Sequence, residues 1–275
     1  MRVILLHGRA AEMDIPSLME ADMAAALWYG LDRISAGVPR TAFDVRLAFY
    51  GDLWRPDAHQ PLPRIEPTQE VAEGFPGLGD LSLWVDEHLG IGEALLDRML
   101  RDVDSYFSEP ALRAATNARL IDAVTAEPAD QEGVVVVGFS MGTFVAYDTL
   151  RQEADLPVAA LITVGSPLGM PSMHRRLVAN SPVTPPAPPT PFPPQLGMWV
   201  NVWTKDDVAT AGHVDLAVRY PSTDPALRVQ DVETWGRAAT PTNPVGAHNA
   251  LDYLSSRVFA KALLTAIQMI QADHP

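Results

Sequence analysis

The chain has 275 residues, of which 47% are hydrophobic and 20% charged, a formal net charge of −14 at pH 7, and no cysteine. This is the composition of a globular protein with enough apolar residues for one large core. An acidic surface repels phosphate backbones and anionic lipid, so we expect neither nucleic acid nor a membrane as a partner. The lack of cysteine excludes disulfides, thiolate metal sites and cysteine nucleophiles.

Apolar runs of strand length alternate along the chain with longer segments of helical period. In chain order they predict a strand at 2–8, a helix at 17–34, a strand at 41–51, a loop at 55–80, helices at 81–107 and 111–126, a strand at 133–140, a helix at 141–154, strands at 159–169, 198–207 and 227–236, and a helix at 250–270. This alternation predicts one α/β domain over 1–275, with a mostly parallel sheet covered on both faces.

The start of the chain contains only a short apolar run, residues 3–6, which is too short for the core of a signal peptide. No apolar run elsewhere reaches the length of about 18 residues that a membrane span needs. We therefore expect a cytoplasmic protein.

The segment VVVVGFSMG, residues 134–142, joins a predicted buried strand to a helix through a serine with glycine two places before and two places after it. In parallel α/β sheets, ligands lie beyond the carboxyl ends of the strands, and a side chain that projects there needs a tight turn beneath it. Glycine at 138 and 142 avoids collisions with that turn or with neighbouring strands. Ser140 is therefore a candidate nucleophile; a serine that only caps the helix is the alternative.

A serine nucleophile needs a base, and the base needs an acid that orients it. Of the seven histidines, His248 lies in the loop after the last predicted strand and just before the final helix. From that loop an imidazole can reach over the sheet edge towards Ser140. We expect His248 to be the base; a surface loop histidine is the alternative.

The acid is expected at a strand end between the serine and the histidine, and Asp206 and Asp207 are adjacent at the end of the fifth predicted strand. Counting forward along the strand favours Asp207, whereas counting back from the apolar Val208 allows Asp206. The aspartate that is not the acid belongs to an ordinary charged turn.

Two backbone N–H groups are candidates for binding an oxyanion. One belongs to Met141, at the start of the helix after Ser140, and the other to Arg9, in the loop after the first predicted strand. Both are chosen for their position, because a backbone donor does not depend on the side chain.

The segments LLHG, GFSMG, ITVGSPLG, NVWTKDDVA and AHNALDYL occur in this order, and in them the chain resembles the α/β-hydrolase family. The resemblance covers 3–254 and implies an α/β-hydrolase fold, a three-layer sandwich that lacks the family's first two, antiparallel strands. GSPLG, and the spacing of His248 and Tyr253, are similar to bacterial serine esterases and lipase-like members. The chain departs from the family in its aspartate doublet and in having Arg9 after HG without a further glycine.

In this family, the connection at 170–197 often carries a lid over the site. Here it contains a Pro-rich stretch, 181–194, that cannot form a helix or a central strand and should be extended. A lid-like cap with an apolar wall is one interpretation, and a spacer is the other. The wall would consist of Met170, Met173, Phe192 and Met198.

The sequence thus predicts a serine hydrolase that cleaves an ester or thioester through an acyl-enzyme on Ser140, without a metal or cofactor. Its expected partner is a small-molecule acyl substrate of unspecified chain length, and no pattern indicates the oligomeric state. Three alternatives stay open: acyl transfer, amide hydrolysis by the same residues, and a non-catalytic binding protein of the same fold.

Overall fold

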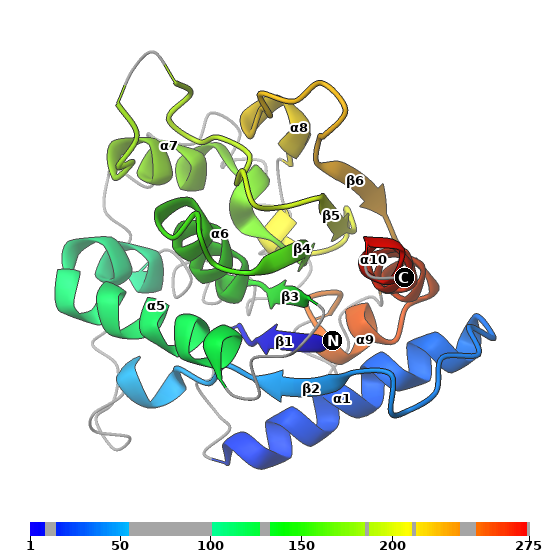
Figure 1. The fold of residues 1–275 in the computed structure, drawn as a ribbon. Helices are drawn as coiled ribbons and strands as arrows, with labels where there is room; N and C mark the ends of the chain where they lie inside the picture. Colours follow the sequence, from blue (N-terminus) through cyan, green and yellow to red (C-terminus); the bar gives the residue numbers. More distant parts are fainter. Residues whose placement is uncertain are drawn as a thin grey trace.

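A computed structural model describes residues 1–8, 15–54, 101–126, 133–184, 187–210, 213–236 and 246–273. Within them the chain forms a six-stranded sheet in the order β2-β1-β3-β4-β5-β6, and every neighbouring pair is parallel (Figure 1). The strands are β1 (Arg2–Leu6), β2 (Asp44–Leu47), β3 (Val134–Phe139), β4 (Val158–Val164), β5 (Met198–Trp203) and β6 (Gln230–Glu233). The predicted α/β fold with a parallel sheet is confirmed.

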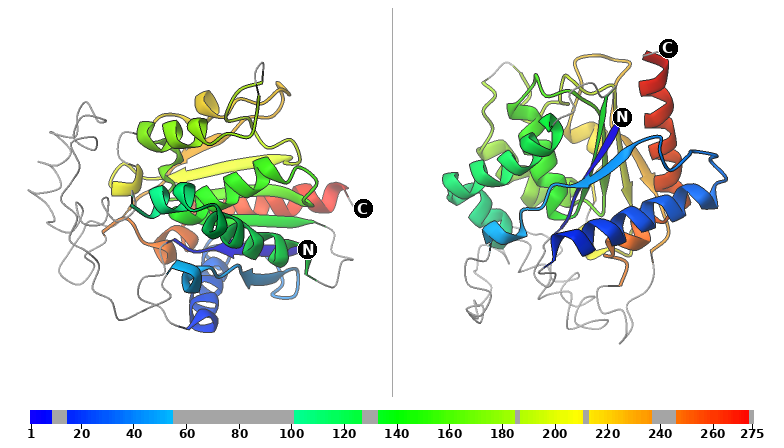
Figure 2. Two further views of the ribbon diagram at one scale, coloured as in Figure 1. Left: turned by 90° about the vertical axis from the view of Figure 1, so that its left-hand side faces the viewer. Right: turned by 60° about the horizontal axis from the view of Figure 1, so that its bottom comes forward.

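Helices cover both faces of this sheet, and the right-hand panel of Figure 2 shows the two helical layers on either side of it. The first layer consists of α1 (Pro16–Arg33), α9 (Ala250–Leu254) and α10 (Arg257–Asp273). The second contains a helical stretch at 101–108, α5 (Pro110–Thr125), α6 (Met141–Gln152), α7 (Pro171–Ala179) and α8 (Leu216–Arg219). Three short 3-10 turns are η1 (Gly51–Trp54), η2 (Pro167–Gly169) and η3 (Val208–Thr210).

The four consecutive valines of β3 explain how one strand serves two cores. Val134 and Val136 belong to the core under α5, α6 and α7, while Val135 and Val137 belong to the core under α1, α9 and α10. Successive strand side chains point to opposite faces, so a central strand with helices on both sides must be apolar throughout. The run of valines is therefore the sequence signature of this central position.

The strand order reverses between β1 and β3. From β1 the chain passes through α1 to β2 on one side, and β3 pairs with β1 on the other side. In open parallel sheets, the crevice at such a reversal, beyond the carboxyl ends of the strands, is the usual place for a ligand. Gly8 after β1 and Ser140 after β3 both lie at this reversal.

Several element boundaries differ from the prediction. The final helix is split at Ser255 and Ser256 into α9 and α10, and α7 forms where no helix was predicted. The strand predicted at 198–207 ends at Trp203, because the chain turns there. The loop predicted at 55–80 and most of the helix predicted at 81–107 lie outside the described residues.

The Pro-rich segment packs beside α6. The Tyr147 hydroxyl donates to the Pro191 carbonyl over 2.9 Å, and the Gln195 amide donates to the Leu150 carbonyl over 2.9 Å. These partners lie in the second half of α6, about 10 Å or more along the helix axis from Ser140 at the rise of 1.5 Å per residue. The described part of the segment thus attaches to the half of α6 away from Ser140.

The predicted apolar wall is also part of the cores. Met170, Met173 and Phe192 are buried in the core under α6 and α7, whereas Met198 is buried in the core on the opposite face. These four side chains therefore do not form one surface. Among the described helices, none combines the length and the apolar character needed to cross a bilayer.

Candidate active site

Ser140 occupies a strained turn between β3 and α6. Its backbone has φ 53° and ψ −122°, and it is one of two non-glycine residues with positive φ among those described. Such a conformation costs about 1–3 kcal/mol for a residue with a Cβ and persists only where the surroundings impose it. The Ser140 amide donates to the Val164 carbonyl of β4 over 3.1 Å, which fixes the turn to the sheet.

Glycine is required at both predicted places around this turn. A Cβ on Gly138 would lie 2.9 Å from the Gly142 carbonyl oxygen, inside the turn itself. A Cβ on Gly142 would lie 2.5 Å from the His7 carbonyl oxygen, at the end of β1. The two glycines therefore let α6 start close to both the turn and the neighbouring strand, as the sequence predicts.

His248 connects Ser140 to Asp207. Its Nε2 lies 2.9 Å from the Ser140 Oγ, and its Nδ1 lies 2.8 Å from the Asp207 Oδ1. The Asp207 carboxylate can only accept, so Nδ1 carries the proton and Nε2 is left to accept from the serine hydroxyl. Ser140 and His248 are 108 residues apart in the sequence, and Asp207 lies between them in the chain. All three residues are buried.

Asp207, rather than Asp206, faces the histidine. Because β5 ends at Trp203, the two aspartates lie in a turn in which the Asp207 amide donates to the Thr204 carbonyl over 3.1 Å. This turn buries Asp207, which is 1% exposed, and leaves Asp206 on the surface. The aspartate within hydrogen-bond distance of His248 is therefore Asp207, and this turn brings it there rather than a continuing strand.

Met141 is the first residue of α6 and follows Ser140 directly. An amide in the first turn of a helix has no acceptor within that helix, and its N–H lies at the positive end of the helix dipole. Arg9, the other predicted oxyanion donor, lies outside the described residues.

His7 is a buried histidine that the sequence analysis did not assign to the site. Its Nδ1 donates to the Gly8 carbonyl, and its Nε2 accepts from the Tyr50 amide over 3.2 Å. Burial lowers the pKa of His7 to about 4, although the bond to Gly8 raises it in part. The neutral ring thus holds the chain next to Gly8, whose Cβ, if present, would lie 2.9 Å from the Ser140 Cβ. Its place directly before that glycine was the available signal.

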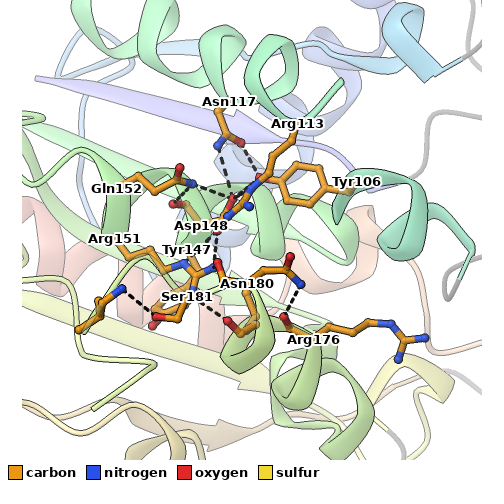
Figure 3. A network of polar contacts seen from close by, with 12 residues as sticks. Tyr106, Arg113, Asn117, Tyr147, Asp148, Arg151, Gln152, Arg176, Asn180 and Ser181 are labelled. Carbon is orange, nitrogen blue, oxygen red and sulfur yellow. Dashed lines mark hydrogen bonds and ion pairs between the residues drawn. The ribbon is translucent and has the colours of Figure 1, made fainter. Parts of the chain in front are cut away.

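A buried ionic network supports α6 from behind (Figure 3). Asp148 is fully buried and accepts from Arg113 over 2.6 Å and from Arg151 over 2.9 Å. Arg151 also donates to the Leu177 carbonyl over 3.1 Å. The network therefore fastens α5 and α7 to the helix that starts at the serine.

Comparison with protein-family models finds no match, and comparison with curated proteins finds none either. The chemistry of the site therefore has to be argued from its geometry. Among the described residues there is no group of three or more acidic, histidine or cysteine side chains that could hold a metal ion. The arrangement can move a proton from a serine hydroxyl to an imidazole whose other nitrogen faces a carboxylate.

Proposed function

We propose that this protein is a serine hydrolase that cleaves a carboxylic ester or thioester through an acyl-enzyme on Ser140. The observation that carries the proposal is the unbroken hydrogen-bonded line from the Ser140 hydroxyl through His248 to Asp207. Nucleophile, base and orienting acid are the three roles that such a line can fill, and the triad is recognised by this geometry rather than by the fold.

The placement of the serine adds support. Ser140 stands on a strained strand-to-helix turn at the carboxyl edge of a parallel sheet, next to the reversal of strand order. A turn of this kind exposes a nucleophile above the sheet while the helix behind it offers N–H groups. We infer an α/β-hydrolase type of fold from this turn and from the order serine, aspartate, histidine along the chain.

In the proposed reaction, the Ser140 oxygen attacks the acyl carbonyl carbon and its proton passes to the Nε2 of His248. The carbonyl oxygen becomes an anion that the Met141 N–H would bind. When the bond to the leaving group breaks, the alcohol or thiol takes the proton from His248. Water then attacks the acyl-serine and gives a proton to His248. This proton passes to the Ser140 oxygen when its bond to the acyl carbon breaks, which releases the acid and free Ser140. Asp207 stabilises the imidazolium at each stage.

Labelling with a fluorophosphonate probe tests the proposal, because such probes react covalently with activated serines. We expect the protein to be labelled, the Ser140→Ala variant to be unlabelled, and its kcat for ester hydrolysis to fall by at least about 10³-fold. The matched control is Ser172→Ala, which removes a buried hydroxyl from α7 and should keep both the labelling and the ester hydrolysis. If Ser140→Ala keeps near-native turnover or labelling, the proposal fails.

The same residues would support acyl transfer to an alcohol or amine, or amide hydrolysis. A panel of p-nitrophenyl esters of graded length beside acyl-thioesters, each with and without an added acceptor alcohol or amine, separates these reactions. We propose a small-molecule acyl compound as the substrate class. An unlabelled protein without turnover in the whole panel would indicate a binding protein instead.

A further inference from the structure

Asp207 accepts hydrogen bonds from other groups as well as from His248. Its Oδ1 accepts from the Ala209 amide over 2.8 Å and lies 2.8 Å from the His248 Nδ1. Its Oδ2 accepts from the Tyr253 hydroxyl over 2.7 Å and is 3.0 Å from the same imidazole nitrogen. Tyr253 therefore makes the shortest contact to the second carboxylate oxygen.

The Tyr253 hydroxyl is a proton donor under all ordinary conditions. Tyr253 is 2% exposed, and burial, the charge of Asp207 and the hydrogen bond to it all raise the pKa of the phenol well above its usual range. A protonated phenol has one hydrogen to donate, and a carboxylate can only accept it. The contact thus has a fixed direction, from the tyrosine to the aspartate.

The position of the Tyr253 ring is set by its own helix and by the packing around it. The Asn249 side chain caps α9 by accepting from the Leu251 amide over 2.9 Å. Gly165 leaves room for both groups, because a Cβ there would lie 3.0 Å from the Tyr253 ring and 3.0 Å from the Asp207 carboxylate. The hydroxyl therefore reaches Asp207 from a rigid element and not from a loop.

We propose that Tyr253 is a positioning residue that acts through Asp207: it holds the carboxylate in the plane that faces the Nδ1 of His248. This inference rests on the proposed function. Three donors on two oxygens prevent the carboxylate from rotating about its Cβ–Cγ bond, so the imidazolium formed during acyl transfer meets its counter-charge without rearrangement. Tyr253 itself takes part in no step of the reaction.

The Tyr253→Phe variant removes one oxygen atom and leaves the ring. We expect kcat to fall about 10- to 100-fold, the range that corresponds to the loss of a hydrogen bond to a charged group. KM should stay within about twofold, because the hydroxyl contacts the aspartate and not the substrate. The matched control is Tyr147→Phe, which removes another buried phenol oxygen, bonded to the Pro191 carbonyl, and should leave kcat unchanged.

A second measurement does not depend on turnover. The low-field proton resonance of the His248 Nδ1–H reports its hydrogen bond to Asp207, and it should shift or broaden in Tyr253→Phe but not in Tyr147→Phe. Incorporation of 3-fluorotyrosine at 253 keeps the fold and the hydroxyl but makes the phenol a stronger donor. It should also shift the resonance from its wild-type position.

The outcomes separate the two proposals. In one outcome, both phenylalanine variants lose stability while kcat and the resonance stay unchanged in Tyr253→Phe. That result would overturn the positioning role and leave the hydrolase proposal intact. Absence of labelling and turnover in the wild-type protein would refute the hydrolase proposal. The resonance would then still decide whether Tyr253 holds Asp207 against His248. If Tyr253→Phe does not fold, an unchanged resonance in the fluorotyrosine protein overturns the inference.

Discussion

Asp206 and Asp207 are neighbours in the chain but lie in different environments. Asp207 is buried and accepts from the Ala209 amide, from Tyr253 and from His248, whereas Asp206 is exposed. A buried carboxylate without such donors would be costly, because desolvation penalises its charge. Its three donors are therefore part of what keeps Asp207 in place.

These environments predict opposite outcomes for two adjacent substitutions. Asp207→Asn should lower kcat about 10⁴-fold, because the His248 ring loses both its tautomer control and its counter-charge. Asp206→Asn should leave kcat within about twofold and change the free energy of unfolding by no more than about 0.5 kcal/mol, as is usual for a surface position. Ester kinetics and urea denaturation of both variants measure these effects. Near-native kcat in Asp207→Asn would remove the acid from the proposed mechanism.

The position of helix α9 depends on the close approach of helix α1. A Cβ on Gly30 of α1 would lie 2.7 Å from the Leu254 carbonyl oxygen at the end of α9. Near this contact the Arg33 side chain donates to the Ser255 carbonyl over 3.0 Å. Because α9 carries Tyr253, the spacing of two helices in one layer determines where that hydroxyl reaches the site.

The Gly30→Ala variant tests this close approach, because the contact determines whether the free energy of unfolding rises or falls. In an exposed helix, alanine is more favourable than glycine by about 1 kcal/mol. Here we expect the opposite, a loss of about 1–3 kcal/mol, because the obstacle is backbone and one of the helices must shift. Thermal or urea unfolding measures the change. A Gly30→Ala protein more stable than wild type would show that α1 and α9 are not in this contact.

The buried network around Asp148 is a second link between elements. Burial alone would raise the pKa of Asp148, but the hydrogen bond from Arg113, the charge of Arg151 and the hydrogen bond from Tyr106 bring that pKa below its ordinary value. Removing one member of such a network would leave an uncompensated buried charge, which is more costly than the pair is stabilising. The network thus fixes α5, α6 and α7 relative to one another.

For the whole molecule, the strand order brings distant parts of the chain to one edge. β1 and β3 are neighbours although about 130 residues separate them, and their register pairs Leu6 with Gly138. This pairing puts His7 and Gly8 beside Ser140. A buried histidine and a buried ionic network then make the stability of the whole fold depend on pH.

We expect the free energy of unfolding to fall in two stages on acidification. Between pH 6.5 and about 4, the unfolded chain binds a proton at His7 that the folded chain excludes, so stability falls by up to about 3 kcal/mol. The lowered pKa of Asp148 contributes to the free energy of unfolding above about pH 4. This contribution is lost as the pH falls through the pKa that Asp148 has in the folded protein.

Urea denaturation at a series of pH values measures both stages. His7→Gln keeps a polar side chain but cannot titrate, so the decline between pH 6.5 and 4 should become shallower in this variant. An identical pH profile for His7→Gln and the wild type would mean that His7 is not the group responsible for the first stage.

The sequence by itself determined the class of the fold and a short set of candidate residues for the site. Alternating strand and helix periods predicted a parallel sheet, the valine run identified a central strand, and the two glycines identified the turn at Ser140. These are local signals, because periodicity and turn geometry depend on residues close in the chain. His248 and the aspartate pair Asp206–Asp207 became candidates through the rule that the carboxyl ends of parallel strands share one edge.

Only the tertiary structure decided the features that depend on contacts between distant segments. The Asp206–Asp207 ambiguity ended because β5 stops at Trp203 and the turn buries one aspartate. The Pro-rich segment lies beside α6 because its carbonyls and amides find partners there, which no local pattern encodes. The roles of His7 and Tyr253 depend in the same way on burial and on donors that the fold supplies. Desolvation and hydrogen-bond geometry are properties of the packed molecule, and they have no counterpart in the chain before it folds.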